Sequence, residues 1–185
     1  PVVSDLATSA AANGKLEIAQ RLNKSIPEGW VQTKDGQPST DPSELKKGGA
    51  LLPLGSMEEA GHKGYALATV VDIFSAVLSG ANYGPWVPPF VSFLPLAPDM
   101  PGQGIGHFVG AMRVDGFRPM DEYNKNIENW IERFKSSPAI DDKKVLIPGE
   151  PEIFEQENRL QNGIPLTDAV TKDLEELGVK LGVKL

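Results

Sequence analysis

Apolar residues recur at helical spacing in several parts of this 185-residue chain. The most regular run follows Pro119 and predicts an amphipathic helix that ends near Lys135. Its apolar positions are Met120, Tyr123, Ile127, Trp130, Ile131 and Phe134. Because aromatic residues at this spacing usually pack, we assign the stripe to a core or a subunit interface rather than to a site.

A second apolar run predicts a helix from Lys63 to Leu78 that ends at Gly80. Alanine fills most positions between the larger apolar residues, so we expect this helix to be buried nearly all round. The segment from Ala10 to Leu22 also has helix-forming composition, despite its Asn-Gly pair. We therefore expect three substantial helices in these parts of the chain.

Two shorter helices are predicted near the C-terminus. One runs from Pro151 to Asn162, before Gly163, and the other begins after Thr167 as N-cap and ends at Leu177, before Gly178. Two strands are expected as well. Val2 and Val3, at the start of the chain, are residues typical of a strand. The run from His107 to Val114 is typical of a strand buried on both faces.

The remaining segments are rich in turn residues. From Lys24 to Pro53 the sequence is polar, with several Pro, Gly and Asp clusters, and predicts a long surface excursion. The segment from Ala81 to Met100 holds too many prolines for a regular element. We expect it to be a loop ordered by Trp86 and Phe90.

Composition narrows the class of protein. The hydrophobic content of 40% suits one globular core, and the net charge of −7 disfavours nucleic acid and anionic lipid as partners. With no cysteine, disulfides and thiol nucleophiles are excluded, and the cytoplasm is the default expectation for location. No stretch has the length of a membrane span. The opening at Pro1, without an initiator Met, suggests the middle of a longer polypeptide.

General catalytic motifs are absent. The glycines from Gly102 to Gly106 precede strand-like text rather than a helix, so they do not form a dinucleotide fingerprint. Only two histidines occur, His62 and His107, which disfavours a histidine-based metal site, and we assign no metal. The adjacent pair Glu58 and Glu59 lacks the convergent geometry of paired catalytic carboxylates and is better interpreted as a solvated turn.

The most informative local feature is the run from Gly61 to Leu67, Gly-His-Lys-Gly-Tyr-Ala-Leu. Two glycines bracket His62 and Lys63 at the start of a predicted helix, where free N–H groups favour an anionic group such as a pyrophosphate. The alternative is that Gly61 and Gly64 only allow a tight entry to the helix. In that case His62 and Lys63 are solvated on its first turn.

These motifs together resemble the type 2 malate/L-lactate dehydrogenases. The resemblance rests on an ordered series of short runs that spans nearly the whole chain. These runs are Val3 to Ser9, Pro27 to Trp30, Asp35-Gly36, Thr40 to Pro42, Gly49 to Gly55, Gly61 to Leu67, Leu78 to Ala81, Gly106 to Phe108 and Ile147 to Pro151. Several motifs in the right order are far more specific than any one alone.

The resemblance implies an α+β fold without a Rossmann domain: a cofactor-binding sheet with packed helices, of which this chain is the C-terminal half. It implies a division into residues 1–118, the major part of the cofactor domain, and residues 119–185, a helical segment that packs on the absent N-terminal portion. A homodimer is implied as well.

The resemblance also implies NAD or NADP as cofactor and a small 2-hydroxy or 2-oxo acid, malate- or lactate-like, as substrate. The family includes enzymes for malate, L-lactate, ureidoglycolate, sulfolactate and diketogulonate, and reductases of cyclic imino acids. By resemblance, three separated segments contact the cofactor. Their residues are Val3, Ser4, Asp5 and Ala7, then His62 and Lys63, then Gly149, Glu150 and Pro151.

The family's proton-transferring histidine lies in an early S-x-H motif, and neither His62 nor His107 has that context. We interpret His62 as a cofactor neighbour and leave His107 as a strand residue that is either functional or structural. Asp5 is the one catalytic candidate, since a carboxylate could orient the imidazole and stabilise its protonated form. Its alternative is an N-cap or turn acceptor for the next helix.

Glu150 has two interpretations as well: it accepts from a ribose hydroxyl, or it supplies negative charge at the helix begun by Pro151. The function expected from the resemblance is hydride transfer between NAD(P) and a 2-hydroxy or 2-oxo carbon. The rival is a non-catalytic fragment, an oligomerisation or cofactor-binding module that keeps the fold without turnover. The sequence does not separate NAD from NADP, because no ribose-reading residue can be placed without Rossmann geometry.

Overall fold

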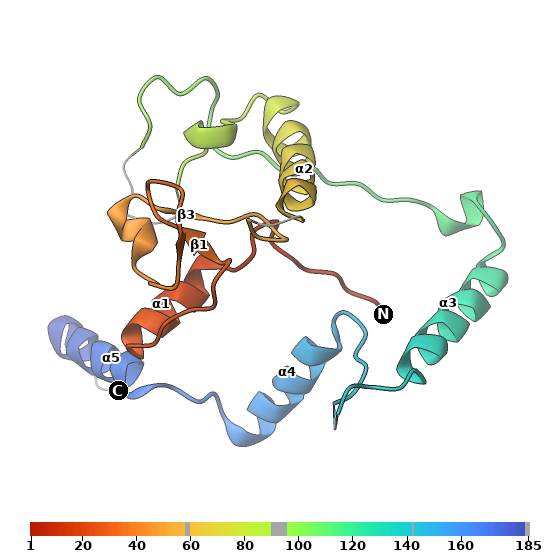
Figure 1. The fold of residues 1–185 in the computed structure, drawn as a ribbon. Coiled ribbons are helices and arrows are strands. Elements are labelled where there is room, and N and C mark those ends of the chain that lie inside the picture. The colour runs from red at the N-terminus through yellow and green to blue at the C-terminus, as the bar shows by residue number, and fades with distance from the viewer. Residues whose placement is uncertain (58–59, 90–95, 142, 184–185) are drawn as a thin grey trace. The chain divides into compact units, whose positions relative to one another are not determined.

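The computed structural model describes residues 1–57, 60–89, 96–141 and 143–183. Contacts divide the chain into two compact units: residues 1–6 with 112–185, and residues 7–111. Figure 1 shows the elements of both units. The predicted turn at Glu58-Glu59 and the predicted packing of Phe90 lie outside the described residues. The predicted domains, 1–118 and 119–185, stay a prediction.

The unit of residues 7–111 is built around α1 (Asn13–Arg21) and a small antiparallel sheet. The strands are β1 (Val31–Gln32), β2 (Pro38–Ser39) and β3 (Ala50–Leu51), in the order β2-β1-β3. Val31 is paired with Ser39 on one side and with Leu51 on the other. The central strand thus gains hydrogen bonds on both edges, which fixes its register.

The core of this unit lies between α1 and the sheet. Leu16 of α1 and Val31 of β1 are both 0% exposed, and Ala11 and Ile26 complete the buried cluster. The helix prediction for this segment is confirmed, although α1 begins three residues later than Ala10. Its apolar face is narrower than predicted, because Ile18 and Leu22 are exposed.

The predicted surface excursion from Lys24 to Pro53 is wrong, since this segment supplies all three strands and the buried residues Ile26, Val31 and Leu52. The turn residues are used to fold the chain tightly back on itself. Gly36, at φ +78°, lets the chain reverse between β1 and β2, and the turn closes when the Gly36 N–H donates to the Thr33 carbonyl. The turn residues of this segment therefore indicated a hairpin rather than a loop.

The predicted helix from Lys63 to Leu78 is confirmed as α2 (Gly61–Asp72), which continues into a π-helical turn (Ile73–Val77). Its predicted burial is wrong: within the described chain only its small residues, Gly61, Gly64 and Ala76, are buried. Helical spacing decides which residues share a face, but burial needs a second surface to cover that face. The larger apolar residues from Leu67 to Leu78 are exposed here.

Both predicted strands are wrong. Val2-Val3 forms no strand, because a single backbone hydrogen bond, from Val3 to Pro148, does not make a ladder. Residues 107–113 are irregular and are followed by a 3₁₀ turn (Val114–Gly116). A strand needs a neighbour to receive its N–H and C=O groups, and the described residues provide none for this segment.

The other unit carries three helices: α3 (Met120–Lys135), α4 (Glu150–Asn162) and α5 (Asp168–Leu181). The predictions for α3 and α4 are confirmed. The predicted stop of α5 at Leu177 is wrong, because the helix runs through Gly178 to Leu181. Its end is set by Gly182 at φ +68°, where the Val183 N–H donates to the Gly178 carbonyl in a glycine C-cap.

Candidate functional site

The first residues of the chain lie against the turn that precedes α4. The backbone N–H of Val3 donates to the carbonyl oxygen of Pro148 at 2.9 Å. Gly149 is at φ +98°, and a Cβ placed on it would lie 3.0 Å from the Cβ of Val3. The glycine is therefore required both by its backbone conformation and by the close approach of the N-terminal segment. Two segments predicted to contact a cofactor meet at this point.

Glu150 joins the same turn to the end of α3 through its two carboxylate oxygens. Its Oε2 accepts from the Ile147 N–H at 2.9 Å, its Oε1 contacts the Lys135 ammonium, and its own N–H donates to the Ile147 carbonyl. Lys135 and the Ile147 N–H lower the pKa of the Glu150 carboxyl. This geometry supports the structural interpretation of Glu150, because a ribose hydroxyl would have to compete with these partners.

Ser4 and Asp5 have free polar groups. Both side chains are exposed, and no hydrogen bond to either is found among the described residues. Helix α1 begins at Asn13 with Ala12 as its N-cap residue, so the alternative that Asp5 caps the next helix is wrong. Asp5 thus keeps a carboxylate with no structural partner in the part of the chain that the structure describes.

An apolar pocket of about 430 Å³ lies in the same unit, and no motif in the sequence predicted a site there. It is lined by Val2, Arg118, Tyr123, Asn126, Ile127 and Trp130. The helical period correctly places Tyr123, Ile127 and Trp130 on one face of α3. That period carries no signal that Val2, more than a hundred residues away, lies beside them.

In the unit of residues 7–111, the segment after Ala7 pairs with the Leu-Leu-Pro-Leu motif. Leu54 N–H donates to the Thr8 carbonyl at 2.8 Å, and Ala10 N–H donates to the Leu52 carbonyl at 2.8 Å. Ser9 and Pro53 form the bridge between these bonds. Ala7 is therefore held next to residues 52–54. The predicted contact of its side chain with a cofactor stays a prediction.

The same motif supports the first turn of α2. A Cβ on Gly61 would lie 2.0 Å from the Ser56 carbonyl oxygen, and one on Gly64 would lie 1.9 Å from that of Leu54. Both distances are impossible for a side chain, so the glycines are explained by close packing of the helix on residues 54–56. This favours the tight-entry interpretation of the two glycines. His62 and Lys63, between them, are exposed.

The structure therefore groups the predicted site residues as two sets. Val3 lies with Gly149 and Glu150 in one unit, next to the exposed Ser4 and Asp5 and to Pro151 at the start of α4. Ala7 and the pair His62–Lys63 lie in the other unit, on segments that both pack on residues 52–56. The N-terminal segment contributes to both sets.

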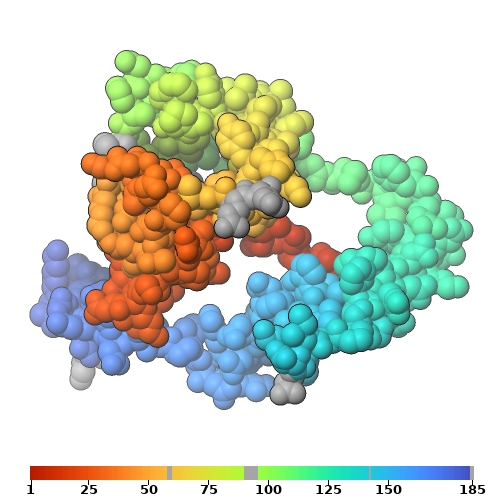
Figure 2. Space-filling model, viewed as in Figure 1, coloured from red at the N-terminus to blue at the C-terminus, as the bar shows by residue number. Residues whose placement is uncertain are grey.

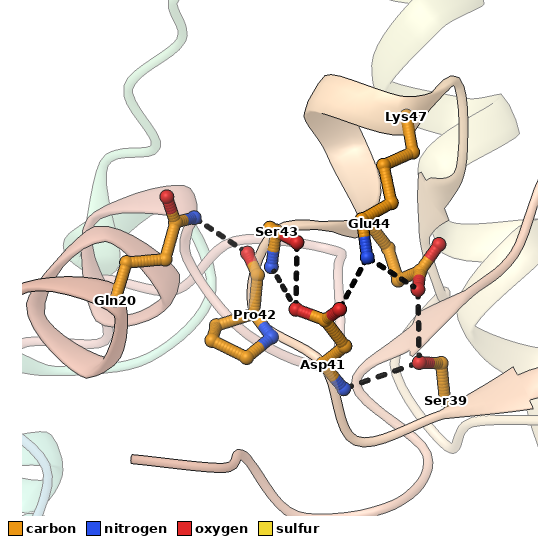
Figure 3. A network of polar contacts seen from close by, with 7 residues as sticks. All are labelled: Gln20, Ser39, Asp41, Pro42, Ser43, Glu44 and Lys47. Carbon is orange, nitrogen blue, oxygen red and sulfur yellow. Dashed lines mark hydrogen bonds and ion pairs between the residues drawn. The ribbon is translucent and has the colours of Figure 1, made fainter. Parts of the chain in front are cut away.

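A polar network around Asp41, not predicted from the sequence, holds the small sheet together (Figure 3). Asp41 Oδ1 accepts from the N–H and the hydroxyl of Ser43 at 2.8 and 2.7 Å, and Oδ2 contacts the Lys47 ammonium. Lys47, followed by Ser43, lowers the pKa of Asp41 to about 2. Gln20 of α1 donates to the Pro42 carbonyl at 2.6 Å and so joins the helix to this turn.

Glu44 extends the network into the interior, where it is buried. It accepts from the Ser39 hydroxyl at 3.3 Å and lies 3.6 Å from the Lys47 ammonium. All partners of Asp41 and Glu44 belong to the same turn and sheet. The network is therefore structural, and the Thr40-Asp41-Pro42 motif that carries part of the resemblance has a packing role here.

Two further observations limit the chemistry of the described residues. No group of three or more His, Asp or Glu side chains in the described ranges could hold a metal ion. Within those same ranges, no helix combines the length and apolar character required to cross a bilayer. His107 is exposed, on the irregular segment that follows Gly106.

Comparisons with known proteins agree with these motifs. The family model for malate/L-lactate dehydrogenase matches residues 1–175. A malate dehydrogenase of Pyrococcus horikoshii is 36% identical over 187 residues, covering 100% of this chain and 50% of that protein. The crystal structure of malate dehydrogenase from Entamoeba histolytica matches with a TM-score of 0.77 and 27% identity, over 100% of this chain and 52% of that one.

A Delta(1)-pyrroline-2-carboxylate/Delta(1)-piperideine-2-carboxylate reductase of Pseudomonas putida is 47% identical over 83 residues, 45% of this chain and 23% of that protein. The chain thus spans about half the length of the relatives that it matches from end to end. Because the family model covers 175 of its residues, the chain belongs to the malate/L-lactate dehydrogenase family.

Proposed function

We propose that this chain forms the cofactor-contacting part of an NAD(P)-dependent oxidoreductase that acts on a small 2-hydroxy or 2-oxo acid. The observation that carries the proposal is the hydrogen bond between Val3 and Pro148. It joins two segments, distant in the sequence, that the resemblance assigns to one cofactor. Membership of the family supports the reaction class.

The residues at this junction fit a nucleotide. Ser4 offers an exposed hydroxyl and Asp5 an exposed carboxylate, the groups that bind sugar hydroxyls and amides. Gly149 has no side chain to obstruct the backbone of the turn. When bound, the nicotinamide would accept or donate the hydride. The protein's part is to hold and orient the reacting groups.

Asp5 is proposed as the group that orients a proton-transferring histidine supplied by polypeptide outside this chain. A carboxylate that accepts from one imidazole nitrogen fixes the tautomer and stabilises the protonated ring. Its lack of a structural partner among the described residues leaves Asp5 available for this bond. Asp5→Asn keeps the shape and removes the charge, so we expect a large loss of kcat and a smaller loss of affinity for NAD(P)H.

Lys63 and His62 are proposed to face the phosphates of the same cofactor. Both are exposed on the first turn of α2, where the helix dipole favours negative charge. Since Gly61 and Gly64 are explained by packing, the proposal depends on the exposed side chains of the His-Lys pair and not on the glycines. The Lys63 ammonium would supply the charge, and His62 a neighbouring polar contact.

The relatives favour two related substrate classes. Malate dehydrogenases of the family point to a 2-hydroxy or 2-oxo acid. The pyrroline-2-carboxylate reductase points to a cyclic imine beside a carboxylate, a second candidate that the 47% local identity favours. In both classes hydride adds to an sp² carbon next to a carboxylate, so the same nicotinamide position would serve either.

The helices in the unit of residues 1–6 and 112–185 have little core of their own. Ile147, 4% exposed, is the one large apolar residue that is buried in its described part, while Trp130 and Phe134 of α3 remain 42% and 47% exposed. A unit with so small a core needs another surface to cover its helices. We propose that residues 119–185 pack on the half of the enzyme that this chain does not match, within a homodimer.

The test uses this chain together with the complementary half, defined as the half of the P. horikoshii malate dehydrogenase that this chain does not match. Titration calorimetry with NADH and NADPH measures cofactor binding by the pair. Steady-state oxidation of NAD(P)H with oxaloacetate, pyruvate and Delta(1)-piperideine-2-carboxylate measures turnover. We expect binding of one cofactor and turnover of at least one acid.

Binding without any turnover would support the rival function, a non-catalytic cofactor-binding or oligomerisation module. Absence of cofactor binding would overturn the proposal. The relative's own two halves, expressed separately and mixed in the same way, provide the positive control for both measurements.

A further inference from the structure

Two Asn-Gly pairs occur in the chain, and the structure holds them in different ways. Asn13 and Gly14 are the first two residues of α1, whereas Asn162 ends α4 and Gly163 follows it. In such a pair the backbone nitrogen of the glycine can attack the side-chain amide carbon of the asparagine, because glycine has no Cβ to obstruct the approach. The dipeptide sequence is the same at both places, so any difference in reactivity comes from the fold.

The two glycine nitrogens differ in their hydrogen bonds. The N–H of Gly14 is one of the first amides of α1, which have no helical carbonyl four residues earlier, and it has no acceptor among the described residues. The N–H of Gly163 donates to the Arg159 carbonyl at 2.9 Å and closes the end of α4. Attack by the Gly163 nitrogen therefore requires a hydrogen bond to break first, and attack by the Gly14 nitrogen does not.

The first turn of α1 is also weakly held. Its N-cap residue is Ala12, which has no side-chain oxygen for the free amides, and the turn has no acidic residue. Gly14 lowers the helix propensity further. Attack requires Asn13 to rotate out of the helical conformation, and a turn without these stabilising groups opens at low cost. The reacting atoms can therefore meet while the rest of α1 stays folded.

We propose that Asn13 is a deamidation site, where α1 is modified faster than the second Asn-Gly pair. The Gly14 nitrogen loses its proton and bonds to Asn13 Cγ, the bond between Cγ and Nδ2 breaks, and Nδ2 leaves as ammonia with that proton. One water molecule then opens the cyclic imide. Opening at Cγ gives aspartate, and opening at the backbone carbonyl carbon gives isoaspartate, in which the main chain runs through Cβ and Cγ. No oxidant or cofactor is consumed.

The aspartate product changes one side-chain contact. Asn13 Nδ2 donates to Glu17 Oε1 at 3.0 Å, so the nitrogen that leaves is the atom that joins these two residues. The new carboxylate faces that of Glu17 four positions along the helix, which is unfavourable, but it also lies at the positive end of the helix dipole, which is favourable. These two effects are of similar size and oppose each other.

The isoaspartate product changes the backbone between two buried residues. Ala11 and Leu16 lie on either side of the Asn-Gly pair, and both belong to the buried cluster that contains Val31. Figure 2 shows the atoms of α1 and of residues 25–50 as one continuous body. One extra backbone atom between Ala11 and Leu16 must either shift α1 or unwind its first turn. Isoaspartate at position 13 therefore weakens the packing of α1 on the sheet.

Peptide mapping by mass spectrometry on the full chain tests the proposal during incubation at neutral pH. In concentrated urea, where the fold no longer distinguishes the pairs, Asn13 and Asn162 should react at rates within about twofold of each other. In the folded chain Asn13 should react at least about fivefold faster than Asn162. Equal rates in the folded chain, or a faster reaction at Asn162, would overturn the proposal.

Substitution of the attacking residue tests the chemistry. Gly14→Ala keeps the fold, since nothing lies within 4 Å of its Cβ position, and its methyl group should slow the reaction of Asn13 at least about tenfold. Gly163→Ala, in the other unit, is the matched control and should leave the rate at Asn13 unchanged. Undiminished reaction of Asn13 in Gly14→Ala would contradict attack by the nitrogen of residue 14.

Melting temperatures test the structural consequence. The chain that has reacted at Asn13 should melt at a lower temperature than the fresh chain, whereas Asn13→Gln, whose longer side chain would have to close a larger ring, should be unchanged by the same incubation. Fresh Asn13→Asp carries the new charge on a normal backbone and should melt close to the unmodified chain. An equal loss in fresh Asn13→Asp and in the reacted chain would contradict the extra backbone atom as the cause.

Discussion

The backbone N–H of Val3 donates a 2.9 Å hydrogen bond to the carbonyl oxygen of Pro148. This bond places the first segment of the chain beside the Gly149 turn, across 145 positions of sequence. No local pattern encodes such a contact, because it depends on the path of the whole C-terminal unit. Its consequences can be measured through the glycine that makes the approach possible.

Gly149→Ala should destabilise the turn by about 1–3 kcal/mol, because the new Cβ meets the Cβ of Val3 and the residue keeps a positive φ. Urea denaturation measures this loss, and calorimetry measures the accompanying loss of NAD(P)H affinity. Gly182→Ala is the matched control: its backbone is also left-handed, but nothing lies within 4 Å of its Cβ position. Equal destabilisation by both variants would show that contact with Val3 is unimportant.

Gly64→Ala should disrupt the entry to α2, because its Cβ would lie 1.9 Å from the Leu54 carbonyl oxygen. We expect a loss of about 2–3 kcal/mol or failure to fold, since backbone must move to make room. Gly14→Ala, within α1 and with nothing within 4 Å, should instead stabilise the chain by up to about 1 kcal/mol. Thermal melts of the two variants should therefore shift in opposite directions.

Lys63→Ala should weaken NAD(P)H binding at least about tenfold and leave the melting temperature nearly unchanged. The exposed ammonium makes no structural contact among the described residues, so its removal should affect only an anionic ligand. Lys34→Ala, at the exposed turn between β1 and β2, is the control for loss of one positive charge. An unchanged cofactor affinity by calorimetry would exclude Lys63 from the site.

Because of Asp41, the stability of the region formed by α1 and the sheet should depend on pH under acidic conditions. Its pKa is lowered to about 2 in the folded chain from an ordinary 3.8, so the folded state favours the ionised form. The resulting stabilisation is present above pH 4 and is lost as the pH falls through about 2. NMR titration of the Asp41 carboxyl should give a midpoint near 2.

Asp41→Asn should remove most of the pH dependence of the free energy of unfolding under acidic conditions, as measured by urea titrations, because the amide cannot ionise. Asp35→Asn, at the exposed turn, should retain it. Since Asp41 and Lys47 are both substantially exposed, added salt should reduce the effect. A salt-independent titration would contradict an ion pair as its main cause.

Asn82, which is 1% exposed, accepts from the Gly102 N–H and donates to the Gly104 carbonyl through its side chain. Asn82→Ala should cost about 1–3 kcal/mol, because it leaves the Gly102 N–H without its partner, whereas the Gly104 carbonyl still accepts from the backbone N–H of residue 82. In this variant, the backbone amides of residues 102–106 should also exchange faster with solvent. Asn13→Ala, which removes an i,i+4 bond to Glu17 on α1, should cost much less. Similar losses of stability for both variants would mean that the hydrogen bonds of the buried Asn82 side chain have little importance.

Much of the helical structure was predictable. The spacing of Met120, Tyr123, Ile127 and Trp130 places α3 correctly, since helix period is a local property. The end of α5 was not predictable in the same way. The chain repeats Gly-Val-Lys-Leu at its C-terminus, and local text does not reveal that the second glycine, Gly182, takes the capping conformation.

The candidate site was predictable only through the ordered motifs. The resemblance selected Asp5, Lys63 and Glu150 but did not show what each contacts. The structure assigns one oxygen of Glu150 to its own turn and the other to Lys135 at the end of α3, and it leaves Asp5 without a partner among the described residues. A carboxylate's neighbours depend on the fold, so the two acids could not be distinguished from sequence alone.

The sequence by itself determined the family, the helices and the residues that share each helical face, because these depend on motif order and on neighbours three or four positions apart. Only the tertiary structure decided that Val3 meets the Gly149 turn and that Lys24 to Pro53 folds into a sheet. It also decided that residues 107–112 have no strand partner in the part of the chain that the structure describes. Hydrogen-bond partners and burial are relations between distant segments, and such relations are fixed when the chain packs.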